Sequence, residues 1–356
     1  MKPLFVSGGV SLLVSLVCTP LLIGWLRTHN IGQQIREDGP QGHFTKAGTP
    51  TMGGLTIVLA SFVGYVAGHF ARVGAVYTYG GLLVMGVVVA AGAVGLADDY
   101  IKFRQQRNLG LNKRAKFGGL LVVGVTFAIL AVTVAHANTH LAFTRFDSLG
   151  INLGKGGMAV LAVLMILATT NAVNLTDGLD GLAAGSSAFV FVAFTIIGFW
   201  QLRHPDIYRV PQPLDLALVA VAMVGACTGF LWWNAAPARI FMGDTGSLSI
   251  GAGIAALALF ENVHLLLPVL CGLLVVETLS VVIQVASFRF FHRRVFRMAP
   301  IHHHFELADW PETTVIIRFW ILAALCMALA LGLFYADYLS RCPATPTPSA
   351  ACQVVD

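Results

Sequence analysis

Long stretches of apolar residues without a single charge recur along the 356-residue chain, and this pattern predicts membrane-spanning helices. A helix needs about 20 mostly apolar residues to cross a bilayer core of about 30 Å. Each of eight uncharged windows can hold one such helix: 3–26, 47–71, 73–97, 117–144, 156–176, 181–202, 216–238 and 319–336.

The stretch from Ser247 to Ser287 is too long for one span, and the polar segment 261–264 interrupts it. We therefore expect two spans with a tight turn between them, which makes ten in total. Glu277 then lies inside the second of these spans and needs a polar partner in the bundle. The prediction is an all-α integral membrane protein with one polytopic domain over 1–340. A tail over 341–356, rich in Pro, Thr, Ser and Ala, is expected to be disordered.

Composition supports this class. The chain is 57% hydrophobic and only 11% charged, with a mean hydropathy of +0.78, which excludes an ordinary soluble protein of this size. No polar stretch is long enough to bury a core of its own. The net charge of +5 does not require a nucleic-acid partner, because basic cytoplasmic loops and anionic lipid account for most of it.

The distribution of basic residues predicts the orientation. With ten spans the loops alternate between the two sides, and one set of loops carries 15 of the 22 Lys and Arg residues while the other carries 7. An excess of Lys and Arg marks the cytoplasmic side. Both termini are therefore expected to face the periplasm or exterior.

Acidic residues at the ends of the predicted spans all fall on the cytoplasmic side, namely Asp98, Asp99, Asp177, Asp180 and Asp244. A carboxylate beside the hydrocarbon is unfavourable without a partner or a function, so such residues indicate a functional site. The run His302-His303-His304 lies on the same side. Together these residues predict a cytoplasmic-face site that handles a cation and phosphates.

Asp98 and Asp99 end the third predicted span, with Lys102 within reach of either. Adjacent residues on a helix point about 100° apart, so the two acids cannot perform the same task equally. A salt-bridged helix end at the interface is the alternative interpretation. It suits a lone Asp better than two acids accompanied by further acidic segments.

The fifth predicted span ends in a polar stripe made of Asn171, Asn174 and Asp177. Gly178 and Gly181 then permit the backbone to leave the helix and approach a ligand closely. An ordinary helix C-terminus explains the glycines but not the two asparagines, so we favour a binding segment that also includes Asp180.

Asp244 lies in a Gly-rich turn before the eighth span. We expect it to precede a helix whose free amides favour a nearby phosphate, with Ser247 as a plausible cap. Carboxylates suit Mg²⁺, which binds through one or two acids plus substrate phosphates. An Asp in such a turn is often only a turn residue, so this segment alone is a weak signal.

Three successive histidines cannot share one face of a regular element, so a metal site made from them alone is not expected. At least one can donate hydrogen bonds to phosphate oxygens. The four arginines at 289, 293, 294 and 297 either contact ligand or simply mark the cytoplasmic side. The segment from Lys46 to Gly54 either holds an anionic group or forms a turn and helix start. Gln284 lies two turns after Glu277 on the same helix face.

Taken together, the chain resembles the phospho-N-acetylmuramoyl-pentapeptide transferases, within the polyprenyl-phosphate N-acetylhexosamine-1-phosphate transferase superfamily. The resemblance runs from about Gln34 to Trp320. It rests on five cytoplasmic segments in order: 46–54 (KAGTPTMGG), 98–102 (DDYIK), 171–181 (NAVNLTDGLDG), 241–247 (FMGDTGS) and 299–306 (APIHHHFE). The first and last of these are typical of the muramoyl-pentapeptide branch.

The resemblance implies ten helices with both termini outside, a homodimer, Mg²⁺ and a place in the bacterial cytoplasmic membrane. It implies transfer of phospho-N-acetylmuramoyl-pentapeptide from UDP-N-acetylmuramoyl-pentapeptide to undecaprenyl phosphate, which gives lipid I and UMP. On this basis Asp98, Asp99 and Asp244 are expected to be catalytic. Asp244 is expected to hold the metal, and Asp98, with Asp99 close behind, to act on the acceptor phosphate. Contacts with substrate are expected for Lys46, Thr51, Lys102, Asn171, Asn174, Asp177, Asp180, Asn234, Phe241, Gly243, Gln284, His302, His303 and His304.

Two alternative functions remain open at this point. A relative that transfers N-acetylglucosamine-1-phosphate to the same lipid differs in its nucleotide sugar, and the histidine run argues against it. A cation- or proton-coupled transporter needs relay acids spread through the bilayer depth, whereas only Glu277 lies clearly in mid-span. Direct transfer is preferred, with a covalent phospho-aspartate intermediate as its alternative.

Overall fold

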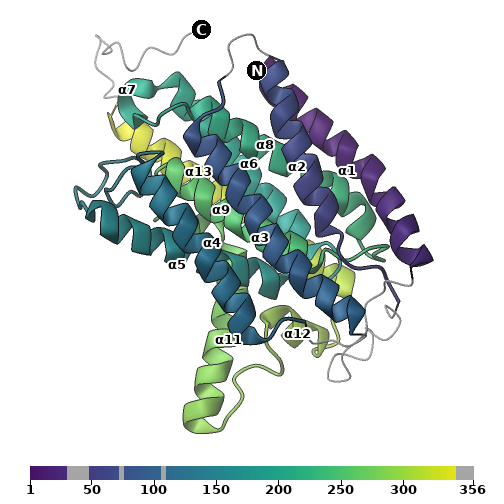
Figure 1. The fold of residues 1–356 in the computed structure, drawn as a ribbon. Coiled ribbons are helices and arrows are strands. Elements are labelled where there is room, and N and C mark those ends of the chain that lie inside the picture. The colour runs from purple at the N-terminus through teal and green to yellow at the C-terminus, as the bar shows by residue number, and fades with distance from the viewer. Residues whose placement is uncertain (30–47, 72–75, 106–109, 342–356) are drawn as a thin grey trace.

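The computed structural model describes residues 1–29, 48–71, 76–105 and 110–341, and it is helical apart from its loops (Figure 1). Within these ranges ten helices have 17 residues or more: α1 (Lys2–Thr28), α2 (Gly54–Phe70), α3 (Tyr79–Arg104), α4 (Lys113–Thr133), α5 (Gly154–Thr176), α6 (Leu182–Arg203), α8 (Pro213–Asn234), α9 (Gly243–Phe260), α11 (Gly272–Phe291) and α13 (Glu312–Arg341). Three short helices connect them: α7 (Pro205–Tyr208), α10 (Leu267–Leu270) and α12 (Ile301–Glu306).

Nine of the helices in the described ranges are long and apolar enough to cross a bilayer, and α2 is a shorter apolar helix of 17 residues. Helices satisfy their own backbone hydrogen bonds, which is why they can cross lipid. The fold is therefore that of a multi-pass membrane protein. Of the predicted tail over 341–356, Arg341 is the last residue of α13 and 342–356 lie outside the described residues.

The predicted division of 247–287 into two helices is confirmed. Helix α9 ends at Phe260, a turn follows, and α11 begins at Gly272 after the short α10. The ends of two other helices are also defined by the structure. Helix α3 continues to Arg104, so Asp98 and Asp99 lie inside its last two turns. Helix α4 ends at Thr133, and the rest of the window to 144 is loop, in which Asn138 donates to the Phe146 carbonyl oxygen (3.1 Å).

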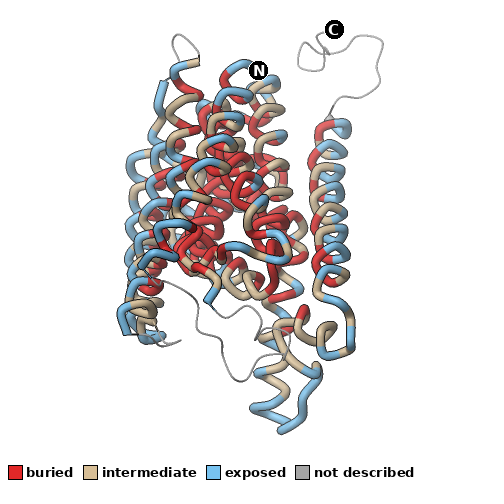
Figure 2. The backbone as a smooth tube through the Cα atoms, turned by 90° about the vertical axis from the view of Figure 1, so that its right-hand side faces the viewer, coloured by how far each residue is buried: buried red, intermediate tan, exposed pale blue. Residues whose placement is uncertain are grey.

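Helix α9 forms the centre of the bundle and is almost entirely buried. Figure 2 shows the same division across the molecule, with buried backbone inside and exposed positions on the outer helix faces. Such apolar outer faces are normal where lipid replaces water.

Helices α1 and α8 pack through a row of serines. The hydroxyls of Ser7, Ser11 and Ser15 donate to backbone carbonyls of Leu218, Ala222 and Ala226, at 3.1, 2.6 and 2.9 Å. Small residues with hydroxyl groups permit this close approach where lipid supplies no hydrophobic driving force.

Both views place the start of α1 and the end of α13 at one end of the bundle (Figures 1 and 2). Helix α12, with the three histidines, lies at the opposite end, where α3 also ends (Figure 1). The predicted acidic and histidine segments therefore lie at one end of the bundle, opposite the start of α1 and the end of α13.

Candidate active site

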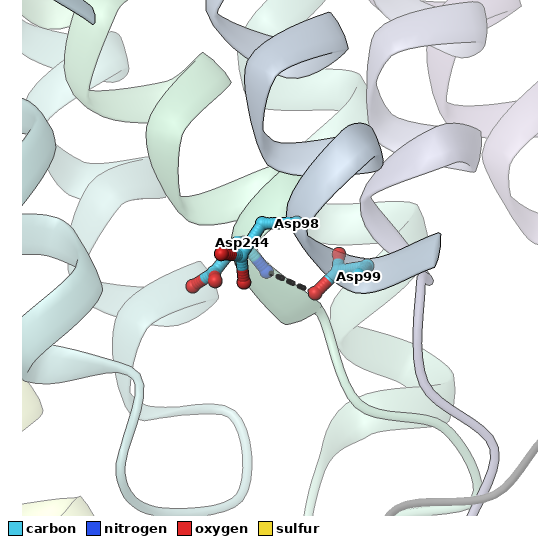
Figure 3. Close-up of side chains that lie close together, drawn as sticks. All are labelled: Asp98, Asp99 and Asp244. Carbon is cyan, nitrogen blue, oxygen red and sulfur yellow. Dashed lines mark hydrogen bonds between the residues drawn. The ribbon is translucent and has the colours of Figure 1, made fainter. Parts of the chain in front are cut away.

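The start of helix α9 is closed by a carboxylate from α3. Asp99 accepts hydrogen bonds from the backbone N–H of Asp244 (3.1 Å) and of Thr245 (3.0 Å), and from the Thr245 hydroxyl (2.7 Å). Figure 3 shows the first of these bonds. A negative group at a helix N-terminus satisfies free N–H groups and favours the helix dipole. Through these three bonds Asp99 caps α9, and its side chain is buried, with 2% of the residue exposed.

This cap corrects two expectations about the start of α9. Two of the amides that we expected to be free for phosphate are bound to Asp99. Ser247 is not the cap, because its hydroxyl donates back to the Gly243 carbonyl at 3.2 Å. Asp244 itself does not precede the helix but lies in its first turn.

Gly243 makes this arrangement possible. Its φ of +72° is a left-handed conformation that suits glycine, and a Cβ there would lie 2.6 Å from Asp99 Oδ2. The chain therefore turns into α9 directly against the capping carboxylate. This close approach explains why the position needs glycine.

Asp98 and Asp244 are buried too, and both pair with a lysine. The Lys102 ammonium lies 2.6 Å from Asp98 Oδ2 and 2.6 Å from Asp244 Oδ2, while Asp99 Oδ1 is 3.7 Å away. A second cation, Lys116 at the start of α4, lies 2.9 Å from Asp244 Oδ2. Two lysines thus converge on Asp244.

Asp98 and Asp244 are further fixed by polar neighbours. The Leu111 N–H donates to Asp98 Oδ1 at 2.8 Å. The amide of Asn174, on α5, donates to Asp244 Oδ1 at 2.5 Å and to Ser247 Oγ at 2.9 Å. Helices α3, α4, α5 and α9 therefore all contribute to one site. Asn174 faces this site, as predicted for the polar stripe on α5.

These carboxylates fit a divalent cation. Within the described ranges, one group of at least three potential metal-ligating acidic, His or Cys side chains was found, and ligand atoms of Asp98, Asp99 and Asp244 lie within 4.8 Å of one another there. Oxygen donors of this kind suit Mg²⁺. Asp99 is bound to backbone and hydroxyl donors at the start of α9, whereas the main partners of Asp98 and Asp244 are lysine ammonium groups on flexible side chains, which leaves Asp98 and Asp244 as the better-placed ligands.

The segment after Lys46 docks onto the same region. The Phe241 N–H donates to the Pro50 carbonyl (2.8 Å), and the N–H groups of Gly53 and Gly54 donate to the carbonyls of Phe241 (2.9 Å) and Met242 (2.8 Å). This pairing places Thr51 and Phe241 beside the turn into α9, both partly buried. Lys46 lies outside the described residues.

The turn over 177–181 links α5 to α6 beside the cluster. Burial raises the pKa of the Asp177 carboxyl well above its usual range, and the charges of Asp244 and Asp99 act in the same direction. Asp180 is buried, and its Oδ2 accepts from the Ala238 N–H at 2.9 Å. Asn234 is also buried and donates to the Ile240 carbonyl at 2.9 Å.

Not every predicted contact residue faces the acidic cluster. Asn171 is exposed and donates to the Leu167 carbonyl of its own helix at 2.7 Å. The amide of Gln284 donates to the Phe296 carbonyl (3.0 Å) and accepts from the N–H groups of Val295 and Phe296 (3.1 and 2.9 Å). Gln284 thus holds the loop after α11, and a direct contact with substrate stays a prediction.

The three histidines have three different partners. His302 Nδ1 lies 3.0 Å from Glu277 Oε2, and His303 Nδ1 lies 2.6 Å from Glu306 Oε2. His304 Nδ1 accepts from the Arg297 N–H at 3.1 Å. The three rings therefore do not converge on one point, as their succession along the chain requires.

Two residues of the site were missed in the sequence. Lys116 was counted only as a basic residue of the cytoplasmic side, although its place at the start of an apolar helix put it at the depth of the acids. Thr245 donates to Asp99 from backbone and side chain, and no pattern in the sequence pairs it with an acid 146 residues away.

Sequence comparison gives the family. The profile of glycosyl transferase family 4 matches residues 81–262, and signature 1 of the phospho-N-acetylmuramoyl-pentapeptide-transferases matches residues 46–58. The chain is 53% identical over 355 residues to the phospho-N-acetylmuramoyl-pentapeptide-transferase of Frankia alni, covering 96% of this chain and 99% of the relative. The chain belongs to the phospho-N-acetylmuramoyl-pentapeptide-transferase family.

Two further relatives carry the same name. That of Saccharopolyspora erythraea is 51% identical over 355 residues, with 96% of this chain and 98% of the relative covered. That of Streptomyces avermitilis is 48% identical over 358 residues, with 96% and 99% covered. The resemblance inferred from five short segments is thus confirmed, and the relatives match nearly the whole chain.

Proposed function

We propose that this protein is a phosphoglycosyl transferase that makes lipid I. It transfers phospho-N-acetylmuramoyl-pentapeptide from UDP-N-acetylmuramoyl-pentapeptide to undecaprenyl phosphate and releases UMP. The observation that carries the proposal is the cluster of Asp98, Asp244, Lys102 and Lys116 at one end of the bundle, in a chain about half identical to transferases of this name.

The reaction brings together two anionic substrates and an anionic leaving group. Such a transfer depends mainly on positioning and on neutralising charge. A phosphate oxygen of the lipid attacks the sugar-bearing phosphorus as the bond to UMP breaks. Lys102 and Lys116 supply positive charge beside Asp244, while Asp98 orients the acceptor phosphate or takes its proton. Asp99 supports this geometry by capping α9.

Mg²⁺ is part of the proposal. Asp244, with Asp98 beside it, would hold the ion, which supplies positive charge for the phosphate oxygens. Lys102 lies between these two carboxylates, so the ion would neutralise the same pair of groups that the ammonium contacts.

The remaining site residues are assigned to the nucleotide sugar. We place the uridine and diphosphate near Asn174, Asp177, Asp180, Asn234 and Phe241. Asn174 donates to Asp244, Asp177 lies within range of the charges of Asp244 and Asp99, and Asp180 and Asn234 hold the segment before α9 that contains Phe241. Lys46, His303 and His304 are assigned to phosphate or sugar contacts.

We infer ten membrane crossings in the bacterial cytoplasmic membrane, with both termini outside and the site facing the cytoplasm. An even number of long helices and the shared position of the α1 start and the α13 end support this topology. The excess of basic residues on the loops at the site end supports its direction. A homodimer is also expected from the family resemblance.

The test is UMP release by purified protein with Mg²⁺, undecaprenyl phosphate and either UDP-N-acetylmuramoyl-pentapeptide or UDP-N-acetylglucosamine. We expect release with the muramoyl substrate only. Release with the glucosamine substrate alone would move the protein to that related activity, and no release from folded protein would favour a transporter. Stoichiometric UMP release without lipid acceptor would replace direct transfer with a covalent intermediate.

A further inference from the structure

A fully buried acid and histidine lie behind the turn that follows α5. Glu277, on α11, and His302, on α12, are each 0% exposed, and Glu277 Oε2 lies 3.0 Å from His302 Nδ1. A carboxylate buried to this degree needs a partner, and His302 supplies it. A carboxylate oxygen only accepts hydrogen bonds, so Nδ1 is the ring nitrogen that donates here. The second ring nitrogen, Nε2, points away from Glu277.

The other side of the imidazole ring lies against the turn. His302 Nε2 is buried and has no hydrogen-bond partner within the described ranges. A Cβ built on Gly178 would lie 2.3 Å from Nε2 and 2.8 Å from the neighbouring ring carbon Cε1. The ring edge thus occupies the place of a side chain at position 178, which only glycine leaves vacant.

A second contact ties the same turn to α11. Leu179, next to Gly178, packs in an apolar cluster with Leu273, Ile316 and Phe319. Leu273 precedes Glu277 by four residues, so both lie on the same face of α11. Helix α11 therefore supports the turn through an apolar contact at Leu179 and through the His302 ring at Gly178.

We propose that Glu277 is a positioning residue for the nucleotide-sugar substrate, acting through His302 on the turn over 177–181. Its carboxylate fixes the orientation of the His302 ring, and the ring edge fixes Gly178 and so the direction of Asp177. The inference rests on the proposed function, because the turn is placed there at the nucleotide subsite. It gives Glu277 a role in substrate binding at a position where a transporter would use a relay acid.

The first test compares Glu277→Leu with Glu277→Gln. Leucine removes the partner of Nδ1 and frees the ring, so KM for UDP-N-acetylmuramoyl-pentapeptide should rise about tenfold. The kcat and the KM for undecaprenyl phosphate should change by no more than about twofold. Glutamine keeps an oxygen acceptor for Nδ1–H, so Glu277→Gln should stay close to wild type.

The matched control is Glu261→Leu. Glu261 is also 0% exposed, but it follows α9 at the other end of that helix and its carboxyl oxygens have no partner in the described part of the chain. This variant should leave both KM values unchanged. A rise in KM equal to that of Glu277→Leu would show a general effect of removing a buried acid and would overturn the proposal.

The second test is a double-mutant cycle between Gly178 and His302. Gly178→Ala places a methyl group against the ring edge, and His302→Asn keeps an N–H near the Nδ1 position but vacates the space of Nε2. Each single variant should raise KM for the nucleotide sugar by about tenfold, because each disturbs the same contact. The double variant should be no worse than either single variant, since the new methyl group fills the vacated space. Penalties that simply multiply would contradict the proposal.

The outcomes separate this inference from the proposed function. Wild-type protein is assayed first, and its UMP release from the muramoyl substrate tests the function by itself. If wild type is active but the variants lose kcat with KM unchanged, Glu277 acts in the chemical step and the positioning role is wrong. If Glu277→Gln is as impaired as Glu277→Leu while both unfold at the wild-type temperature, the charge and not the orientation of the ring is what matters.

Discussion

Asp99 caps helix α9 by accepting hydrogen bonds from both the backbone N–H and the hydroxyl of Thr245, at 3.0 and 2.7 Å. Its neighbour Asp98 instead faces Lys102 at 2.6 Å. Two consecutive acids on α3 thus have different surroundings, as their angular separation on a helix requires. Asp99 is bound to the start of α9, whereas Asp98 lies beside a lysine, where we propose that it acts on the acceptor phosphate.

This difference predicts separable effects of Asp98→Asn and Asp99→Asn. Asp99→Asn places an amide NH₂ where an acceptor is needed, so the free energy of unfolding should fall by about 1–2 kcal/mol. Asp98→Asn should abolish UMP release with a smaller loss of stability, because the amide oxygen can still accept from Leu111. Thermal unfolding and UMP release, measured on both variants, check this. A stable but inactive Asp99→Asn would show that the cap does not need the charge.

Gly243→Ala should destabilise the protein. The left-handed φ of +72° costs an alanine about 1–2 kcal/mol, and its Cβ would also meet Asp99 Oδ2 at 2.6 Å. The matched change is Gly118→Ala on α4, where a Cβ meets nothing within 4 Å and where alanine favours the helix. We expect a lower melting temperature for the first variant and an unchanged or higher one for the second. Equal melting temperatures would mean that the turn into α9 relaxes without loss.

Asp244→Asn should lose both metal binding and turnover. Asp244 is the carboxylate on which Lys102, Lys116 and Asn174 converge, so its charge organises the site. We expect UMP release to fall at least about 100-fold. Mn²⁺ binding, followed by electron paramagnetic resonance as a substitute for Mg²⁺, should weaken in parallel.

The control for this change is Asp206→Asn, which removes an exposed acid from α7 at the opposite end of the bundle. It should keep wild-type Mn²⁺ binding and activity. If Asp244→Asn binds Mn²⁺ as wild type does, the metal assignment is wrong, whatever happens to turnover.

His264 predicts a pH dependence of stability. Burial lowers the pKa of its imidazole to about 4, and Nε2 accepts a hydrogen bond from the Ala142 N–H at 2.7 Å, which requires the neutral ring. In the unfolded chain the same group titrates near 6.5. The unfolded state therefore binds more protons below pH 6.5, so stability should fall as the pH drops from about 6.5 towards 4, by roughly 3 kcal/mol in all.

The measurement is the unfolding free energy of wild type and His264→Gln at each pH. Glutamine can offer an oxygen to the Ala142 N–H and does not titrate. The difference in unfolding free energy between the two proteins should therefore be constant above pH 6.5 and change with pH only below it. Taking the difference cancels the contribution of other titrating groups such as Asp177. Parallel curves for the two proteins would exclude His264 as the source.

Much of the fold could be predicted from the sequence, because a bilayer imposes one simple requirement. A segment that crosses it must be apolar over about 20 residues, and that property is local. The break at 261–264 was found in this way, with α9 and α11 on either side. The polar end of the third span was predicted to be helical through Lys102, and α3 ends two residues later, at Arg104. The partners of Asp98 and Asp99, in the loop before α4 and on α9, could not be predicted.

The sequence by itself also determined which residue types gather at the site. Charges are unfavourable next to hydrocarbon, so each acid at a span end marked a place where the chain needs a partner or a ligand. The place of Asn174 on α5 and the shared side of the acids followed from helix periodicity and loop alternation, whereas Asn171, predicted for the same stripe, does not face the cluster.

The tertiary structure alone decided what each of these residues does. That Asp99 caps α9, that Lys116 reaches Asp244, and that Glu277 holds His302 against Gly178 depend on contacts between helices distant in the sequence. Residue type and spacing determine the direction of a side chain on its own helix. They do not determine which atom of another helix lies opposite, because that is set by how the helices pack.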